Sequence, residues 1–406
     1  MKNRFLALFI LSIILFTSCR IHFIRLFKFT KDLEKTTIVT QRNFKEVVKC
    51  RVDEYGLYIN ATLNGEIQPR ALGFDTFADS WIDTDTKNNL NVKSKNLMSG
   101  KGGIGAVGAT YISTRIGNID FNKIPYMVMV NEQAGYETLA HGIIGVSLMQ
   151  SFLWTLNFKD STIIITDKLD SVKEYTNGYT INFQPRSSQK TPLLKLVINN
   201  TDTIDAIVDT GNEDFITLNS KFDTKEIKQV NPNSVATIVT NKNRLKKEQL
   251  NDSLYEWSFV KLNTLKMGNY EIKETYAIKT HGWDYGVIGM KFLKNFIVTI
   301  DWYNNNMYLK PIEGRETSIN PTTYGFVCDL YYGKIRVISI FKNSIAEGLG
   351  LQSGDEIEMI NGIEAKDNNR KVTFLLNEGK LGAEVAFKIK GKKNIIHLKN
   401  YNVFAN

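Results

Sequence analysis

Short runs of aliphatic and β-branched residues, bounded by Asn, Asp or Gly, recur through the middle of the chain. Residues 194–198 and 204–208 are two such runs, and their length and composition predict strands. Residues 296–302 (Phe-Ile-Val-Thr-Ile-Asp-Trp) alternate less cleanly and predict a buried strand. One helical turn is predicted for 146–151 and another for 290–295, each directly after a glycine. Long amphipathic helices are absent from this region, so the pattern predicts a mostly β protein.

The middle of the chain contains two copies of one unit. Residues 142–165 and 286–309 align without a gap, because every matched position keeps the same offset of 144 residues. Such self-similarity at a fixed offset indicates a repeated architecture. The matching positions are Gly142 and Gly286, Ile144 and Ile288, Gly145 and Gly289, Phe152 and Phe296, and Thr155 and Thr299.

Two landmarks upstream of these segments extend the repeat. Residues 74–82 (Phe-Asp-Thr-Phe-Ala-Asp-Ser-Trp-Ile) align with 208–216 (Val-Asp-Thr-Gly-Asn-Glu-Asp-Phe-Ile). Between the landmarks, 116–118 (Ile-Gly-Asn) matches 267–269 (Met-Gly-Asn). The order of the landmarks is the same in both copies, which cover residues 48–168 and 176–312.

Asp209-Thr210-Gly211 ends an apolar strand, and an apolar-apolar-Gly motif follows about eighty residues later. This duplicated arrangement resembles the aspartic proteases, most closely the retropepsin-like group, over both repeats. The resemblance implies two tandem β-barrel lobes that form one pepsin-like bilobal unit. It also implies that Asp75 and Asp209 are the catalytic pair acting on a peptide or protein substrate.

The supporting residues follow from the same resemblance. Thr76 and Thr210 are expected to form hydrogen bonds across the interface between the lobes. The strands that end at Gly145 and Gly289 are expected to pack beneath the aspartate loops. Gly211 is expected to let the backbone turn tightly and bring its N–H near the carboxylate.

Two carboxylates a few ångströms apart cannot both ionise readily, so they share one proton. The ionised carboxylate then acts as general base on a bound water, and the protonated one polarises the scissile carbonyl. Such a dyad titrates as a pair. We expect no metal ion and no organic cofactor for this chemistry.

The first repeat reads Asp75-Thr76-Phe77, so the glycine of the motif is replaced. Phenylalanine keeps the N–H, but its side chain disfavours a positive φ and crowds the neighbouring cleft. Two interpretations stay open. Either the loop accepts Phe77 and the enzyme is active with altered specificity or rate, or the first half has become a peptide-binding or structural relic.

Other residues near the motifs carry weaker signals. The glycine-rich segment 99–108 is either a flap over the cleft or a surface loop. Histidines and acids lack the spacing of metal ligands, so no metal site is predicted. Solvated positions are expected for Asp79, Glu213 and Asp214, and no catalytic role is expected for His141 or His281.

A proline-containing linker at 311–321 precedes a third module at 322–403. Tyr324-Gly325-Phe326, a strand at 335–340 and the segment Gly354-Asp355-Glu356-Ile357 occur in an order that closely resembles a bacterial PDZ domain, a small α+β fold. That fold adds an extended or C-terminal peptide to a sheet edge, so the resemblance assigns peptide binding to Tyr324, Gly325 and Phe326. The helix flanking the groove is expected at 369–377. A docking module that never binds a free terminus is the alternative.

The first nineteen residues have the pattern of an export signal. Basic residues precede an apolar run at 5–16, which is too short to span a bilayer. Ser18 before Cys19 resembles the bacterial lipobox, in which cleavage leaves the cysteine as a lipidated N-terminus. Phe16 and Arg20 depart from that pattern, so a plain signal peptide or signal anchor is the alternative.

The lipobox resemblance implies a lipid-anchored protein of the bacterial cell envelope, facing the periplasm or the outside, with a membrane-proximal linker at 20–47. Three cysteines are too few for a disulfide scaffold, and we expect Cys50 and Cys328 to be free thiols. The net charge of +9 is dispersed apart from clusters at 244–247 and 388–393, with no nucleic-acid-binding motif. We therefore expect solvated charged faces and no nucleic-acid partner.

The sequence thus leaves two functional hypotheses. The first is a membrane-tethered aspartic endopeptidase with a PDZ domain that docks peptides or partners. The second is a peptide-binding lipoprotein that reuses the same fold without turnover. Separation of the two carboxylates distinguishes them, because hydrogen-bonded carboxylates favour the enzyme.

Overall fold

The chain is described from a computed structural model. The structure describes residues 39, 41–53, 56–96, 106–129, 141–150, 152–186, 190–219, 235–241, 254–280, 284–315, 321–331, 334–365 and 370–404. Outside these residues lie the predicted signal peptide with Cys19, most of the predicted linker at 20–47, most of the glycine-rich segment 99–108, the basic cluster 244–247, and His281. In the described part of the chain, no helix is long and apolar enough to cross a membrane.

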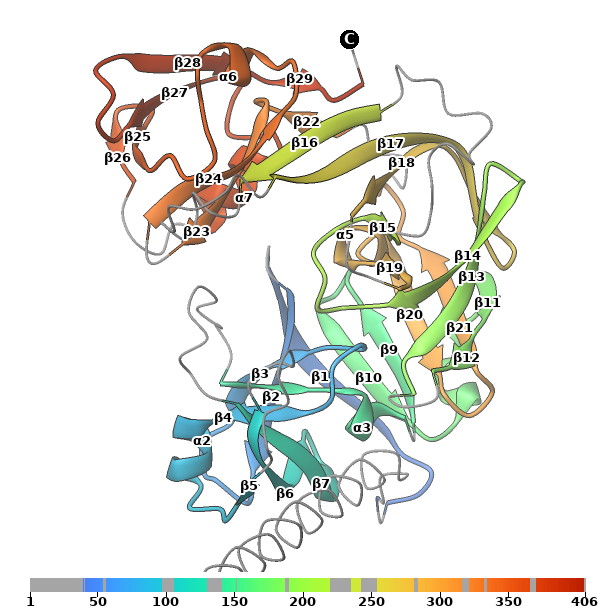
Figure 1. The fold of residues 1–406 in the computed structure, drawn as a ribbon. Coiled ribbons are helices and arrows are strands. Elements are labelled where there is room, and N and C mark those ends of the chain that lie inside the picture. Colours follow the sequence, from blue (N-terminus) through green and yellow to red (C-terminus); the bar gives the residue numbers. More distant parts are fainter. Residues whose placement is uncertain are drawn as a thin grey trace, which may run out of the picture.

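Strands dominate the described chain, and they form two similar lobes followed by a small α+β module (Figure 1). The prediction of a mostly β, bilobal fold is confirmed. The elements of the first lobe are β1 (Lys45–Asp53), β2 (Gly56–Leu63), β3 (Arg70–Phe74), β4 (Trp81–Asp83), α2 (Thr84–Asn89), β5 (Lys95–Asn96), β6 (Ala106–Ile116), β7 (Ile119–Met129), β8 (Gly142–Ile144), α3 (Val146–Met149), β9 (Leu153–Asn157) and β10 (Thr162–Thr166).

The second lobe repeats this order of strands and single-turn helices after a short 3-10 helix, η1 (Leu169–Tyr175). The hairpin turns that join β6 to β7 and β17 to β18 carry Gly117 and Gly268, both at φ 57°. The elements of the second lobe are β11 (Tyr179–Asn182), β12 (Gln184–Pro185), β13 (Pro192–Ile198), β14 (Asp202–Val208), β15 (Ile216–Leu218), β16 (Val235–Asn241), β17 (Leu254–Met267), β18 (Tyr270–Lys279), β19 (Gly286–Ile288), α5 (Met290–Leu293), β20 (Phe296–Asp301) and β21 (Asn306–Pro311).

A sheet in the order β1-β10-β9-β20-β21-β11 joins the two lobes. Its central pair, β9 and β20, is antiparallel, and Thr155 lies directly opposite Thr299. Their buried hydroxyl oxygens are 2.8 Å apart. These two threonines occupy the same position in the two repeats, so their contact marks the pseudo-twofold relation between the lobes.

One hydrophobic core extends through both lobes. Trp154 on β9 is fully buried, and its ring centroid lies 5.3 Å from that of Phe74. In the second lobe the Phe215 ring stacks on Tyr276 at 5.3 Å. Phe74 directly precedes Asp75, and Phe215 follows Asp209 by a few residues. The core therefore fixes the chain on at least one side of each aspartate.

The C-terminal module has its own hydrophobic core, yet it shares a sheet with the second lobe. Strand β16 pairs with β24 in antiparallel register, so the sheet runs from β17 through β16 into β24 and β23 (Figure 1). The module comprises β22 (Thr322–Thr323), β23 (Phe326–Tyr331), β24 (Lys334–Phe341), α6 (Ile345–Gly348), β25 (Ile357–Ile360), β26 (Ile363–Glu364), α7 (Arg370–Asn377), β27 (Glu384–Ile389), β28 (Ile395–Lys399) and β29 (Tyr401–Asn402).

The first lobe begins a few residues before its predicted start near residue 48. β1 starts at Lys45 and pairs there with Thr166 of β10, and Val39 forms an isolated bridge with Phe121. The end of the predicted linker therefore belongs to the lobe. The pattern missed it because alternating exposed and half-buried residues follow one another in β1, without an apolar run.

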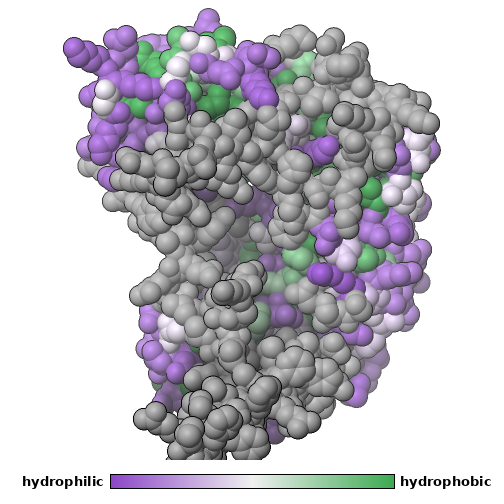
Figure 2. Space-filling view, viewed as in Figure 1, coloured by the Kyte–Doolittle hydropathy of each residue, from purple (hydrophilic) through white to green (hydrophobic). Residues whose placement is uncertain are grey.

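Hydrophilic residues cover much of the coloured surface, with smaller hydrophobic patches between them (Figure 2). In the basic cluster 388–393, Lys388, Lys390 and Lys392 lie within ion-pair distance of Glu358, Glu356 and Asp355 respectively. These lysines complement acids of their own module, as expected for a solvated charged face.

The contact between Thr155 and Thr299 predicts a measurable coupling between the lobes. Thr155→Val leaves the Thr299 hydroxyl buried without its partner, so we expect the free energy of unfolding to fall by about 1–3 kcal/mol. The double variant with Thr299→Val is expected to cost less than the sum of the single variants. Chemical denaturation measures all three, with the exposed Thr203→Val as control. Strict additivity would contradict the coupling.

Candidate active site

The two aspartates lie on equivalent loops. Asp75 follows β3, which pairs in parallel with β8, and its N–H donates to the carbonyl of Ile144 at 3.0 Å. Asp209 follows β14, which pairs in parallel with β19, and its N–H donates to the carbonyl of Ile288, also at 3.0 Å. Each loop is thus held by the strand of the apolar-apolar-Gly motif.

The glycines at the ends of these two strands are required by close approach. A Cβ at Gly145 would lie 2.2 Å from the carbonyl oxygen of Ala78, and one at Gly289 would lie 2.2 Å from that of Asp214. Backbone atoms cannot move away as a side chain can, so both positions exclude a side chain. The structure places both glycines directly against the aspartate loops.

Thr76 and Thr210 connect the two loops by four reciprocal hydrogen bonds. Each backbone N–H donates to the other threonine's Oγ1, at 3.1 Å in both directions. Each hydroxyl in turn donates across the interface, Thr76 to the carbonyl of Val208 at 2.7 Å and Thr210 to that of Phe74 at 2.8 Å. Both side chains are fully buried. This network fixes the distance between the loops.

The carboxyl groups of Asp75 and Asp209 meet between the loops, and each lies close enough to affect the pKa of the other. Their proximity is also visible from Gly211. A Cβ at that position would lie 2.3 Å from Asp75 Oδ2 and 3.2 Å from Asp209 Oδ1. Both groups therefore surround one small volume, as a shared proton requires.

Burial raises the pKa of both carboxyl groups, and the two are affected unequally. For Asp75, burial is opposed by hydrogen bonds from the N–H groups of Phe77 and Ala78. For Asp209, burial and the nearby charge of Asp75 together raise the pKa well above the ordinary carboxyl range. The two carboxyl groups therefore resist ionising together, and the first proton added belongs to the pair.

Phe77 supports Asp75 as Gly211 supports Asp209. The Phe77 N–H donates to Asp75 Oδ1 at 2.7 Å, and the Gly211 N–H donates to Asp209 Oδ1 at 2.8 Å. Neither residue has a positive φ, so the backbone of this loop accepts phenylalanine at position 77. Gly211 is required because a Cβ there would collide with Asp75.

The Phe77 side chain lies beside an arginine from the second lobe. The guanidinium carbon of Arg186 is 5.8 Å from the Phe77 ring centroid and 4.9 Å from that of Tyr285. All three residues are half-buried. A cation between two aromatic faces is favourable, so Arg186 gives the Phe77 ring a defined partner next to the dyad.

Asp214 and His141, which lie near the motifs, each interact with a neighbouring charged side chain. Contrary to the prediction, Asp214 is not a solvated acid. Burial raises its pKa, and the Lys291 ammonium opposes this effect. The His141 ring accepts or donates at Asp83 Oδ2, 3.0 Å away, and is largely exposed. Among the described residues, no group of His, Cys, Asp and Glu is arranged to hold a metal ion.

The predicted peptide-binding residues of the C-terminal module lie mostly inside it. Tyr324 and Phe326 are each 1% exposed. The Gly325 N–H donates to Thr323 Oγ1 at 3.0 Å, and its carbonyl accepts from the Phe341 N–H at 3.0 Å. Since Gly325 makes these bonds within the module, its N–H is not presented to a terminal carboxylate. The predicted helix is present as α7.

Several residues around the sites carried no sequence signal. Ser80 Oγ accepts from the Gly145 N–H at 3.0 Å, and a serine five residues after the aspartate would have been noticeable only as part of the repeat. Arg186 lies far from both motifs in sequence. The described cysteines, Cys50 and Cys328, are both free, and burial raises the pKa of the Cys50 thiol to about 11.

Comparison with known proteins adds little. No family model matches the sequence, and no curated protein matches it. Among solved structures, the chain is similar to the crystal structure of basic 7S globulin from soybean, with 9% sequence identity and a TM-score of 0.40. The similarity covers 66% of this chain and 95% of that chain. Function is therefore inferred from the residues themselves.

The raised pKa of Asp209 predicts a pH-dependent cost to stability. Below the ordinary carboxyl pKa of about 3.9, folded and unfolded states both hold the proton, and its contribution is fully present. As the pH rises from there through the higher pKa of the folded state, the unfolded state releases its proton first and stability is lost. Asp209→Asn removes this loss.

Thermal unfolding at several pH values measures the effect. We expect the Tm of the Asp209→Asn variant, relative to the unsubstituted protein, to increase as the pH rises from about 4 towards neutrality. Asp170→Asn, at an exposed position, is the control and should show a constant difference. A constant difference for Asp209→Asn as well would contradict the raised pKa.

Proposed function

We propose that the protein is an aspartic-type endopeptidase that hydrolyses peptide bonds in the volume between Asp75 and Asp209. The observation that carries this proposal is that the two carboxyl groups converge on one small volume, on loops tied together by Thr76 and Thr210. A scaffold that only binds peptides would not need four hydrogen bonds between Thr76 and Thr210 to align two carboxyl groups.

Hydrolysis would proceed by general acid–base catalysis on a water between the carboxyl groups. Asp75, ionised, removes a proton from the water as its oxygen attacks the scissile carbonyl carbon. Asp209, protonated, donates its proton to the carbonyl oxygen. The tetrahedral intermediate then collapses: the C–N bond breaks, Asp75 gives its proton to the leaving amine, and Asp209 recovers the proton from the hydroxyl group.

The second candidate function is peptide binding without turnover. Phe77 and Arg186 favour it, because they put an aromatic ring and a cation beside the dyad where the second repeat has only glycine. The convergence of the two carboxyl groups beside Gly211 favours the enzyme, since a ring wedged between them would have separated them. We therefore infer that Phe77 shapes the substrate preference of an active site.

The remaining parts of the proposal concern location and partners. The N-terminal resemblance to a lipobox supports attachment to the cell-envelope membrane through Cys19. The C-terminal module, which resembles a PDZ domain in the order of its motifs, would dock a peptide or partner protein. No metal, organic cofactor or nucleic acid takes part in the proposed activity.

Loss of either proton carrier tests the proposal. Asp209→Asn keeps the size of the side chain and cannot supply the acidic proton, so we expect hydrolysis to fall by at least about 100-fold. The measurement is cleavage of a mixed peptide library between about pH 3 and 7, the range in which carboxyl dyads titrate. Asp170→Asn should cleave as the unsubstituted protein does, and a statine-type analogue should inhibit both. A correctly folded protein that cleaves nothing would refute the enzyme.

Replacing Phe77 by glycine separates the two candidates. If the site is active, Phe77→Gly should stay active and accept bulkier side chains next to the scissile bond, because the ring no longer fills that space. Library cleavage patterns of the two proteins measure the change, and thermal unfolding controls for folding. A protein that is inactive with Phe77 and gains activity with glycine would show that the natural function is binding.

A further inference from the structure

In the C-terminal module, helix α7 closes the free edge of strand β23. The Asn377 carboxamide accepts from the Cys328 N–H at 2.8 Å and donates to the Cys328 carbonyl at 2.9 Å. These are the two groups that a neighbouring strand would use, since β24 occupies the other edge. Two residues on, the Leu330 N–H donates to Asp329 Oδ1 at 2.7 Å. Side chains thus take the place of a strand at this edge.

The chemistry of these contacts identifies what would replace them. A primary carboxamide that donates and accepts at one residue reproduces the hydrogen bonds of a peptide group. An extended peptide added to β23 would form the same bonds, and it would have to displace Asn377 to do so. The edge is therefore closed to a ligand while α7 stays in its observed position.

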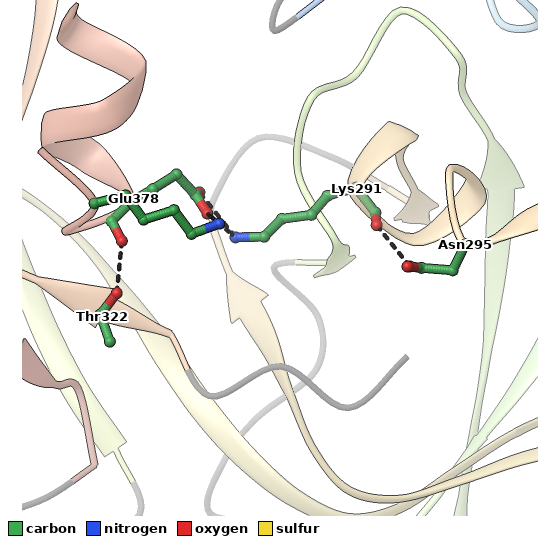
Figure 3. A network of polar contacts seen from close by, with 5 residues as sticks. Lys291, Asn295, Thr322 and Glu378 are labelled. Atoms are coloured by element: carbon green, nitrogen blue, oxygen red, sulfur yellow. Dashed lines mark hydrogen bonds and ion pairs between the residues drawn. The ribbon is translucent and has the colours of Figure 1, made fainter. Parts of the chain in front are cut away.

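The residue after Asn377 reaches out of the module. Glu378 accepts two hydrogen bonds from Lys291 Nζ of α5, at 2.8 and 2.7 Å, and both side chains are mostly buried (Figure 3). The Glu378 carbonyl also accepts from Thr322 Oγ1 at 2.5 Å. Burying an ion pair makes the loss of either partner costly, so this contact attaches the end of α7 firmly to the second lobe.

Helix α5, which carries Lys291, is also bonded to the loop that follows Asp209. The N–H groups of its first residues donate to carbonyl oxygens of the loop that follows Asp209: Met290 to Asn212 at 2.7 Å and Lys291 to Asp214 at 3.3 Å. The Asn212 N–H in turn donates to the Asp209 carbonyl at 3.3 Å. A short chain of hydrogen bonds therefore joins Glu378 to Asp209.

We propose that an extended peptide binds at the edge of β23 by displacing Asn377, and that Glu378 transmits this displacement through Lys291 to the Asp209 loop. With Asn377 in place the edge is closed and the loop is held. With a peptide bound, Glu378 leaves Lys291 and the loop loses its support. The effect on hydrolysis rests on the proposed function; the coupling between the two sites does not.

Coupling between sites is reciprocal. A ligand that orders the Asp209 loop will weaken peptide binding at β23, and a peptide at β23 will reduce hydrolysis. The C-terminal module is then a negative regulator that senses extended peptides, for example the unfolded segments or ends of other proteins.

The test uses the full chain and two independent readouts. The first is hydrogen exchange of residues 209–216 and 286–294, and the second is binding to a synthetic library of ten-residue peptides with free carboxyl ends. Glu378→Gln removes the charge that holds Lys291, so we expect exchange in the Asp209 loop to rise about tenfold, within the usual range of coupling between sites. Asn377→Ala opens the edge of β23 and should raise peptide binding by a similar factor.

The matched control is Lys380→Met, because Lys380 Nζ lies 3.4 Å from the same carboxylate of Glu378 on its exposed side. It should change neither readout. Unchanged exchange at 209–216 in Glu378→Gln would overturn the coupling, and so would a library that binds neither variant. If Asn377→Ala does not fold, Glu378→Gln alone decides, since release of α7 should also raise peptide binding. Failure of the protease proposal would appear separately, as no hydrolysis in any variant with both readouts intact.

Discussion

The hydrogen bonds between Thr76 and Thr210 constrain everything that the two lobes do together. Each lobe can fold around part of the core, but a pair of carboxyl groups is useful only at a fixed separation. The reciprocal bonds supply that separation from buried atoms that solvent does not reach. Elsewhere between the lobes, Thr155 and Thr299 make a second contact between equivalent residues, on the joined sheet. The pseudo-twofold relation is thus held at two points.

This constraint has an energetic consequence. Bringing Asp75 and Asp209 together in a buried place opposes ionisation of both, which the raised pKa values express. The loops offset part of the cost by directing backbone N–H groups at each carboxylate. One proton shared by the pair removes much of the remainder. The same feature that destabilises the fold at neutral pH provides one acid and one base side by side.

Much of this site could be predicted from the sequence because the repeat consists of short motifs. In both copies a strand is followed by Asp-Thr and later by an apolar-apolar-Gly motif. The repeat located Asp75, which no motif alone would have found. It predicted the Gly211 N–H beside the carboxylate of Asp209, but not the collision that excludes a side chain at this position, because that collision comes from Asp75 in the other lobe. Asp214 was misjudged for a similar reason. The charges that affect Asp214 are those of Lys291 and Glu378. These two residues are 87 positions apart and meet only through tertiary packing.

The two lobes differ at two positions near the site, residue 77 in the first lobe and residue 291 in the second. In the first lobe, Phe77 replaces glycine and adds a ring beside Arg186, while its N–H still serves Asp75. In the second lobe, β16 and α5 bind the C-terminal module, and the equivalent helix α3 carries no lysine at the matching position, where Ser147 stands. Both departures leave the hydrogen bonds between the equivalent threonines in place. The threonines are fixed by contact with their counterparts in the other lobe, whereas Phe77 lies beside Arg186 and Lys291 binds Glu378, so these two positions can change without their counterparts.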